Sequence, residues 1–180
     1  MIRSKHLRRF GRAKKGAAAI EFAIIAPLLM VPLLLGSIDL IDVLGVNSRA
    51  QNATASIADV VARDTSVTDE EVAGYSDALQ VLMYPNDPNA LDIRITSISI
   101  VDSSTAIVVW SEGRGTMPAL QAGMPITGLD PRIMTPGTSL ILAESAYRYD
   151  SALQWLFPNG ATFRHKAYRR SRVVDPITRE

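Results

Sequence analysis

The sequence predicts an α+β protein: a long N-terminal transmembrane helix continues into a small exported domain with an accessory helix and an antiparallel sheet. Three observations support this prediction. Residues 17–38 form an apolar run with a single charge, residues 43–60 continue at helical spacing, and the chain from Leu91 onward shows the alternation typical of strands. We therefore expect three parts, a basic cytoplasmic leader at 1–16, a transmembrane helix at 17–38 and an exported periplasmic domain at 39–180.

The segment before the apolar run is basic and contains no acid, with seven lysines and arginines in its first sixteen residues. Such a flank keeps the N-terminus of a membrane helix in the cytoplasm, and Asp39 and Asp42 just beyond the run suit the translocated side. No nucleic-acid-binding motif accompanies these charges, so we expect no nucleic-acid partner. The pattern therefore predicts a chain that crosses its membrane once, with its N-terminus in the cytoplasm.

The apolar run itself is long enough to cross a bilayer. Its twenty-two residues would extend about 33 Å as a helix, against a hydrocarbon core of about 30 Å. Pro27 and Pro32 lie inside it, and membrane helices tolerate proline better than soluble helices do. A cleavable secretory signal peptide is the alternative, but its apolar region is usually shorter, about 7–15 residues. Leu33–Leu35 followed by Gly36-Ser37-Ile38 also make a poor cleavage site for that class.

Glu21 is the one charged residue in the run. A carboxylate within a membrane costs a few kcal/mol on insertion scales, and less near an interface. One interpretation places Glu21 at the cytoplasmic headgroup boundary, near Lys14 and Lys15, where its side chain extends toward water. The other interpretation depends on the neighbouring residues.

The string Lys14-Lys15-Gly16 followed by Ala17-Ala18-Ala19-Ile20-Glu21-Phe22 resembles the class III signal of type IV prepilins. With Pro27-Leu28-Leu29 it is most similar to the TadE-like pseudopilins of the tight-adherence (Flp) pilus. This resemblance implies cleavage by a prepilin peptidase between Gly16 and Ala17, and a role in assembly for Glu21 and Phe22. It implies sister pseudopilins and an inner-membrane pilus platform as partners, and neither cofactor nor small-molecule substrate. Together with the single predicted span, it also implies a location in the bacterial inner membrane, with the domain in the periplasm.

Two departures from the family pattern refine the expected role. Residue 17 is Ala where major type IV pilins often have an aromatic residue or Met, and the chain is far longer than the Flp major pilin. A minor pseudopilin is therefore expected. The larger TadG-like relatives can carry a metal site of the form Asp-x-Ser-x-Ser, but the segment 102–106 lacks the second Ser. The alternative function is a single-pass, envelope-anchored binding module whose N-terminal anchor stays uncleaved.

Two helical patterns follow the membrane run. Small and apolar residues at alternating spacings of three and four predict that the first helix continues to residue 60, packed on its own domain rather than on another subunit. Thr68 and Glu71 form a capping box that opens a second helix, which Pro85 and Pro88 end. The predicted buried stripes are Val43, Val46, Ala50, Ala53, Ile57 and Val60 in the first helix, and Val72, Tyr75, Leu79 and Leu82 in the second.

The later sequence predicts an antiparallel sheet. Residues 91–100 read as a strand with an irregularity near Thr96-Ser97, residues 102–104 as a turn, and residues 105–112 as the second strand of a hairpin. Residues 113–137 contain five Gly and four Pro and predict a long irregular connection. Two further strands are expected over 138–149 and 161–173.

Two features of the exported domain leave alternatives open. Trp155 and Phe157 are interpreted as core residues, with an exposed contact as the alternative. The basic residues from Arg164 to Arg172 are interpreted as a solvated strand face, and contact with anionic headgroups or an acidic neighbour is the alternative.

No residue pattern indicates catalysis. The two histidines, His6 and His165, would lie on opposite sides of the membrane, and the chain has no cysteine. The acids 69–71 favour the start of a helix through its dipole rather than carboxylate chemistry. Gly113-Arg114-Gly115 lacks the context of a phosphate loop. We therefore expect no enzyme activity and no metal site.

Overall fold

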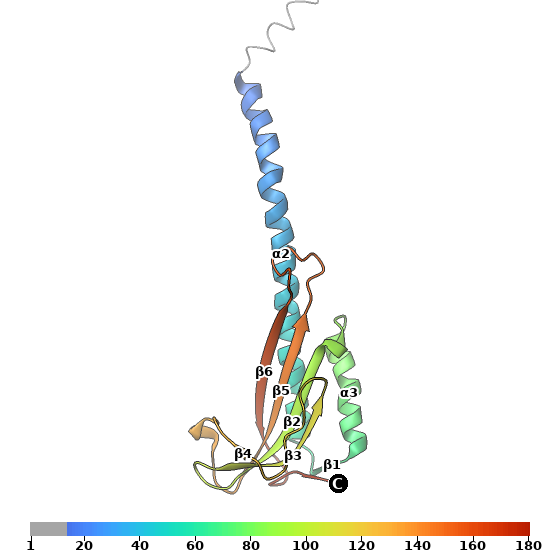
Figure 1. Cartoon of the computed structure of the whole chain (residues 1–180), viewed down its shortest axis with the longest axis vertical. Coiled ribbons are helices and arrows are strands. Elements are labelled where there is room, and N and C mark those ends of the chain that lie inside the picture. The colour runs from blue at the N-terminus through green and yellow to red at the C-terminus, as the bar shows by residue number, and fades with distance from the viewer. Residues whose placement is uncertain (1–13) are drawn as a thin grey trace, which may run out of the picture.

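One helix forms the axis of the molecule. The computed structural model describes residues 14–180, so most of the predicted basic leader, including His6, lies outside the described residues. Helix α2 (Lys14–Val61) has 48 residues, which corresponds to about 72 Å. Its first half extends away from the folded domain and its second half lies against it (Figure 1). The predicted long N-terminal helix that continues into an α+β domain is confirmed.

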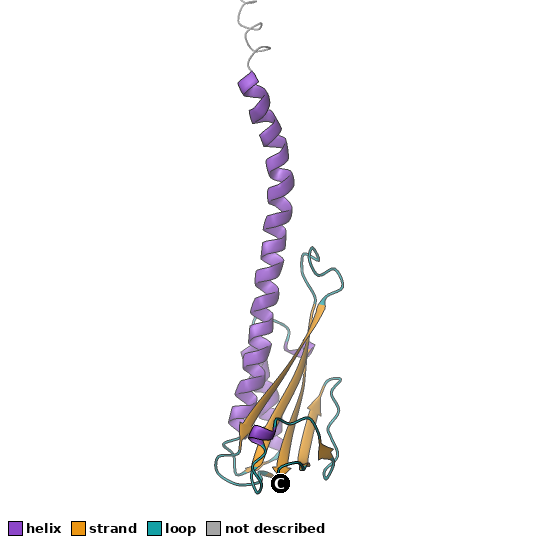
Figure 2. Cartoon of the chain, turned by 90° about the vertical axis from the view of Figure 1, so that its left-hand side faces the viewer, coloured by secondary structure: helices purple, strands orange, loops and turns teal. Residues whose placement is uncertain are grey.

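Two prolines interrupt the hydrogen bonding of α2 without ending it. Pro27 and Pro32 lie inside the continuous helix, which curves gently along its length (Figure 2). Because proline has no amide hydrogen, the carbonyls of Ala23 and Leu28 lack their usual helical donors. Such carbonyls are tolerated in membrane helices when neighbouring groups satisfy them.

The domain is built on a five-stranded antiparallel sheet in the order β4-β3-β2-β5-β6. Strands β5 and β6 lie against the second half of α2, β2 follows them across the sheet, and β6 forms one edge (Figure 1). The four long strands agree with those predicted, within a few residues at their ends. The strands are β2 (Leu91–Ile100), β3 (Ala106–Arg114), β4 (Pro125–Ile126), β5 (Ser139–Tyr149) and β6 (Ala161–Arg170).

The β2–β3 hairpin has the predicted irregularity. The pairing register shifts between Ser97 and Ile98, next to the position predicted from the break in alternation. The turn that follows is held by Asp102, whose carboxylate accepts hydrogen bonds from the backbone amides of Ser104 and Thr105, each at 2.7 Å. The Ser104 hydroxyl donates to the same oxygen, and this bond, followed by the amide bonds, lowers the pKa of Asp102 to about 2. The segment 102–106 therefore serves the turn.

The second half of α2 packs on its own sheet, as predicted. Its stripe from Val43 to Ile57 is buried, and the hydroxyls of Thr54 and Ser145 on β5 share a hydrogen bond at 2.6 Å. Val60 was predicted to complete the stripe, but its side chain is half exposed, and Val61 is buried in its place. After Ile57 the helix needs a step of four residues to return to the same face.

Helix α3 (Asp69–Met83) begins at the predicted capping box, in which Thr68 and Glu71 bond each other's backbone. Leu79 is buried as expected, and Val72 and Tyr75 are partly buried against the core. Leu82 was predicted to be buried but is 38% exposed, and Met83 is fully buried instead. Again a step of four residues, from Leu79, returns to the packed face.

Short elements complete the fold. Strands β1 (Ser66–Val67) and β7 (Thr178–Arg179) form a parallel pair that places the C-terminal segment beside the end of α2. Ile177 is fully buried there, and its carbonyl accepts a hydrogen bond from the Trp110 indole at 2.9 Å. Single 3₁₀ turns, η1 (Pro88–Ala90) and η2 (Pro131–Ile133), follow α3 and β4.

A candidate membrane-anchoring helix and the loop bound to it

The N-terminal half of α2 projects from the domain with its apolar side chains exposed. In the part of the chain that the structure describes, α2 is the one helix long and apolar enough to cross a membrane. Its most apolar stretch has no buried residue within the molecule. Large side chains are exposed on all sides of it, including Ile20, Phe22, Ile24, Leu28, Leu29, Leu33 and Leu34. This surface is what a single-pass membrane anchor requires.

The residues predicted for processing and assembly lie at the start of this exposed helix. Ala17 and Glu21 are one helical turn apart, on the same face. Glu21 and Phe22 are both exposed, and among residues 14–180 the Glu21 carboxylate has no hydrogen-bonding or ionic partner. Gly16 lies within the helix, and a Cβ added there would meet nothing within 4 Å. Among the described residues, no packing contact therefore requires glycine at position 16.

Asp39 binds the loop that connects β5 to β6, here called the β5–β6 loop (residues 150–160). Its side chain is only 2% exposed. The backbone amides of Trp155 and Leu156 donate to one carboxylate oxygen, at 3.1 Å and 2.9 Å, and the Ser151 hydroxyl donates to the other. The Ser151 hydroxyl in turn accepts a hydrogen bond from the amide of Gln154, at 2.8 Å. One acidic residue thus fixes the loop to the helix where the exposed segment ends.

A second set of contacts holds the base of the loop. The Tyr149 hydroxyl donates to Asp42 at 2.8 Å. Burial, together with this hydrogen bond, raises the pKa of Tyr149 to about 12, so the phenol remains a donor at neutral pH. The Phe157 ring packs edge-on against the Tyr149 ring, with centroids 6.2 Å apart. The loop therefore has a fixed position against α2.

The loop corrects one prediction and reveals a missed site. Phe157 is partly buried against the core, but Trp155, also predicted to be a core residue, is 51% exposed. Asp39 and Asp42 had been interpreted only as markers of the translocated side. One signal was available, since Asp39 lies four residues before Val43 and therefore extends the buried stripe of the helix.

The basic residues of β6 and the segment after it mostly find partners within the domain. Arg172 and Arg169 lie 2.5 Å and 3.8 Å from the Asp59 carboxylate on α2, and Lys166 lies 2.8 Å from Glu144. Asp59 is twenty residues beyond Asp39, about 30 Å further along the helix axis. Arg169 and Arg172 are therefore far from the membrane end, which argues against the headgroup contact considered for them.

The comparison with known families agrees with the N-terminal part of this description. A family model described as TadE-like protein matches residues 16–59. No curated protein and no solved structure matched the chain significantly. The match begins at Gly16, covers the exposed apolar helix and ends within the part of α2 that packs on the sheet. The protein therefore carries a TadE-like N-terminal segment, and the similarity predicted from residues 14–29 is confirmed.

Proposed function

We propose that the protein is a minor pseudopilin, a structural and assembly component of a tight-adherence (Flp) pilus. In this proposal α2 is anchored in the inner membrane, with its N-terminus cytoplasmic and the domain in the periplasm. The partners are the prepilin peptidase, sister pseudopilins and the inner-membrane pilus platform. The observation that carries the proposal is the exposed apolar helix at 17–38, which the protein's own domain leaves uncovered and which lies inside the TadE-like match.

The proposed mechanism is lateral packing of membrane helices and involves no catalysis. In lipid, helices associate through close van der Waals contact and polar interactions rather than through the hydrophobic effect. The exposed segment has a small-residue surface at Ala17–Ala19, Ala23 and Ala26, which lets a second helix approach closely. The carbonyls of Ala23 and Leu28, which lack helical donors, would be available to polar groups on such a partner.

Processing would give Glu21 a charged partner. Cleavage after Gly16 creates an ammonium group on Ala17, one turn from Glu21 on the same helix face. A free ammonium and a free carboxylate within an apolar bundle are each unfavourable, and pairing offsets part of that penalty. The ammonium of a neighbouring subunit would satisfy the same carboxylate and would also set the axial register between subunits.

The mature N-terminus tests this proposal against the alternative of an uncleaved, envelope-anchored binding module. We expect intact mass and terminal sequencing of protein from its native host to show a chain that begins at Ala17. The same preparation, crosslinked in the membrane, should contain other pilus components. A protein that begins at Met1 and crosslinks to none of them would support the binding module, and one that begins near Ser37 would indicate a secretory signal peptide.

A matched pair of glycine variants makes the test specific. Gly16→Leu should leave the leader attached, whereas Gly45→Leu should be processed normally. Both glycines lie in α2, and an added Cβ meets nothing within 4 Å at either position, so the two substitutions have similar local effects on the helix. Retained leader in both variants would point to a general defect in insertion instead of a site at Gly16.

A further inference from the structure

We propose that the β5–β6 loop inserts the side chains of Leu153, Trp155 and Leu156 into the bilayer interface on the domain side of the membrane. The loop would thus be a second membrane contact beside α2. This inference rests on the proposed anchoring of α2 in a membrane, and it adds a lipid-binding surface to the folded domain.

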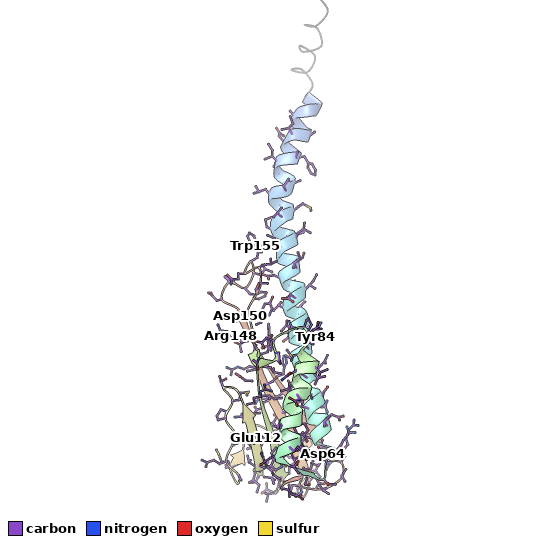
Figure 3. The ribbon with its side chains drawn as sticks, turned by 90° about the vertical axis from the view of Figure 1, so that its right-hand side faces the viewer. Asp64, Tyr84, Glu112, Arg148, Asp150 and Trp155 are labelled. Atoms are coloured by element: carbon purple, nitrogen blue, oxygen red, sulfur yellow. The ribbon has the colours of Figure 1, made fainter. Side chains whose placement is uncertain are left out.

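The position of the loop along the helix is the first argument. A span of 17–38 covers about 33 Å, slightly more than the hydrocarbon core of about 30 Å. The loop is bound at Asp39, directly after this span, and a Cβ on Gly36 would lie 3.7 Å from the Leu156 side chain. Among the labelled residues, Trp155 lies nearest to the N-terminal part of α2 (Figure 3). The loop is therefore at the level where the hydrocarbon core gives way to headgroups.

The side chains at the tip of the loop suit that level. Leu153, Trp155 and Leu156 are 44%, 51% and 47% exposed, while Phe157 next to them turns into the domain. Tryptophan is enriched at membrane interfaces because its ring is apolar and its indole N–H remains near water. Three large apolar side chains grouped on one loop are unfavourable in water and favourable in this region.

The backbone of the loop is also prepared for a less polar environment. An amide without a hydrogen-bond partner is costly to remove from water. At the tip, the amides of Trp155 and Leu156 both donate to Asp39, and the amide of Gln154 donates to Ser151. The loop can therefore approach lipid without leaving these donors unsatisfied.

The outward face of α2 extends the same apolar surface. Beyond the predicted span, Ile38, Leu40, Ile41 and Leu44 are all about half exposed or more, whereas Asp39 is buried against the loop and Asp42 bonds Tyr149. An apolar outer surface from Ala17 to Leu44 is about 42 Å long, close to the 40–45 Å of a bilayer with its headgroups. The two acids do not end the membrane-facing surface, because both are bonded to the domain.

The charges near the loop indicate which kind of lipid surface fits. Arg148 and Asp150 both lie at the β5 end of the loop. Their Nε and Oδ2 atoms are 3.5 Å apart, so the two charges largely offset each other. Ser151 to Gly160 contains no charged residue. The contact is therefore apolar and aromatic, and it should form equally well with zwitterionic and anionic lipids.

Tryptophan fluorescence of the full chain in vesicles tests the inference. The protein has two tryptophans, and Trp110 is only 7% exposed, within the domain core. Phosphatidylcholine carrying bromine on its acyl chains should quench the emission of Trp155 and leave that of Trp110. We expect partial loss of emission in the native protein, no loss in Trp155→Phe, and the same result when phosphatidylglycerol is added. Phenylalanine at this exposed position should leave the fold intact.

Each contrary result has a distinct meaning. If the protein floats with the vesicles but the native chain and Trp155→Phe are quenched equally, or neither is quenched, the loop does not contact lipid and only this inference is wrong. If the protein does not float with the vesicles, the anchoring by α2 is wrong as well. If Trp155 becomes protected from acrylamide only at high protein-to-lipid ratios, a neighbouring copy covers the loop, which also overturns the inference.

Discussion

Two acidic residues of the same helix, Glu21 and Asp39, have opposite surroundings. Asp39 is buried and accepts hydrogen bonds from Ser151, Trp155 and Leu156, so its charge is satisfied within the molecule. Glu21 is exposed on an apolar surface, and in the described chain no side chain or amide bonds to it. A carboxylate in that position gains from a partner outside the folded chain. Asp39 therefore serves the fold, whereas the exposed carboxylate of Glu21 fits the role in association that we propose for it.

We predict that Glu21→Gln leaves membrane insertion and leader processing intact but reduces association with sister pseudopilins. The neutral side chain lowers the insertion penalty, yet it leaves the ammonium group of Ala17 without its counter-charge. Co-purification from native membranes, together with surface pilus output at normal expression, measures the effect. Asp77→Asn is a suitable control, since Asp77 is an exposed acid of α3. If both variants assemble as well as the native protein, the Glu21 side chain only extends toward water at the headgroup boundary and has no role in association.

Sequence reasoning located Glu21 but not the role of Asp39. Glu21 is recognisable because a single charge interrupts an apolar run, and its spacing from Gly16 adds a family pattern. The role of Asp39 could not be predicted in this way, because its partners lie in a loop more than one hundred residues later in the chain. The same contact explains why Trp155 was wrongly placed in the core. Asp39 binds the loop with the Trp155 side chain exposed, and the residues next to Trp155 in the sequence give no sign of this contact.

At the scale of elements, small residues bring α2 close to the sheet. Ala50, Ala53, Ala58 and Ala62 have no exposed surface, and the helix passes over β5 and β6 (Figure 1). A close helix-to-sheet contact buries apolar area on both sides and leaves little space for larger side chains. Packing in this half of α2 therefore contributes to the stability of the folded domain.

We predict that Ala53→Leu destabilises the domain by about 1–3 kcal/mol, because additional methylenes in a filled core displace their neighbours. Gln51→Leu, on the exposed face of the same helix, should change stability by less than about 0.5 kcal/mol. Urea unfolding of the full chain in detergent micelles measures both, with Trp155 replaced by Phe so that only the buried Trp110 emits. A similar midpoint for the two variants would contradict the packing described for α2.

Periodicity predicted the long elements well and the short ones not at all. The strands β2, β3, β5 and β6 and both helices are long enough to repeat their pattern several times. By contrast β1, β4 and β7 have two residues each, which is too few to establish alternation. Their pairing is set by the tertiary fold, as in β7, where burial of the preceding Ile177 brings the C-terminal segment beside β1.

At the scale of the whole molecule, the described start of α2 and the C-terminus lie at opposite ends (Figure 1). The last residues are part of the fold, since the Glu180 amide donates to the carbonyl of Val67 and the Asp175 carboxylate accepts from the Ser139 amide at 2.8 Å. A C-terminal addition therefore belongs after Glu180, where it extends from the end of the domain furthest from the proposed membrane.

We predict that a reporter fused after Glu180 is active only if it functions in the periplasm. A basic flank of this kind retains the N-terminus of a membrane helix in the cytoplasm, and a single span would then place the domain on the other side. Alkaline phosphatase should therefore be active in this fusion and a cytoplasm-dependent fluorescent protein should be dark. Fusion of the fluorescent protein before Met1 should be bright in the same cells. The reverse pattern would invert the topology and contradict the proposed location.

The edges of the sheet have a consequence for copies concentrated in one bilayer. An open edge strand is a template for pairing with another chain, and such pairing leads to aggregation. At one edge, β6 exposes Arg164, Lys166 and Arg170, so two β6 strands brought together would place like charges opposite each other. At the other edge, β4 has two residues, the first of them Pro125. Because β4 pairs only with Ala106 and Ile107 of β3, the charge argument applies to the β6 edge. Pairing between neighbouring β6 strands is thus disfavoured even where the helices of several copies are crowded together.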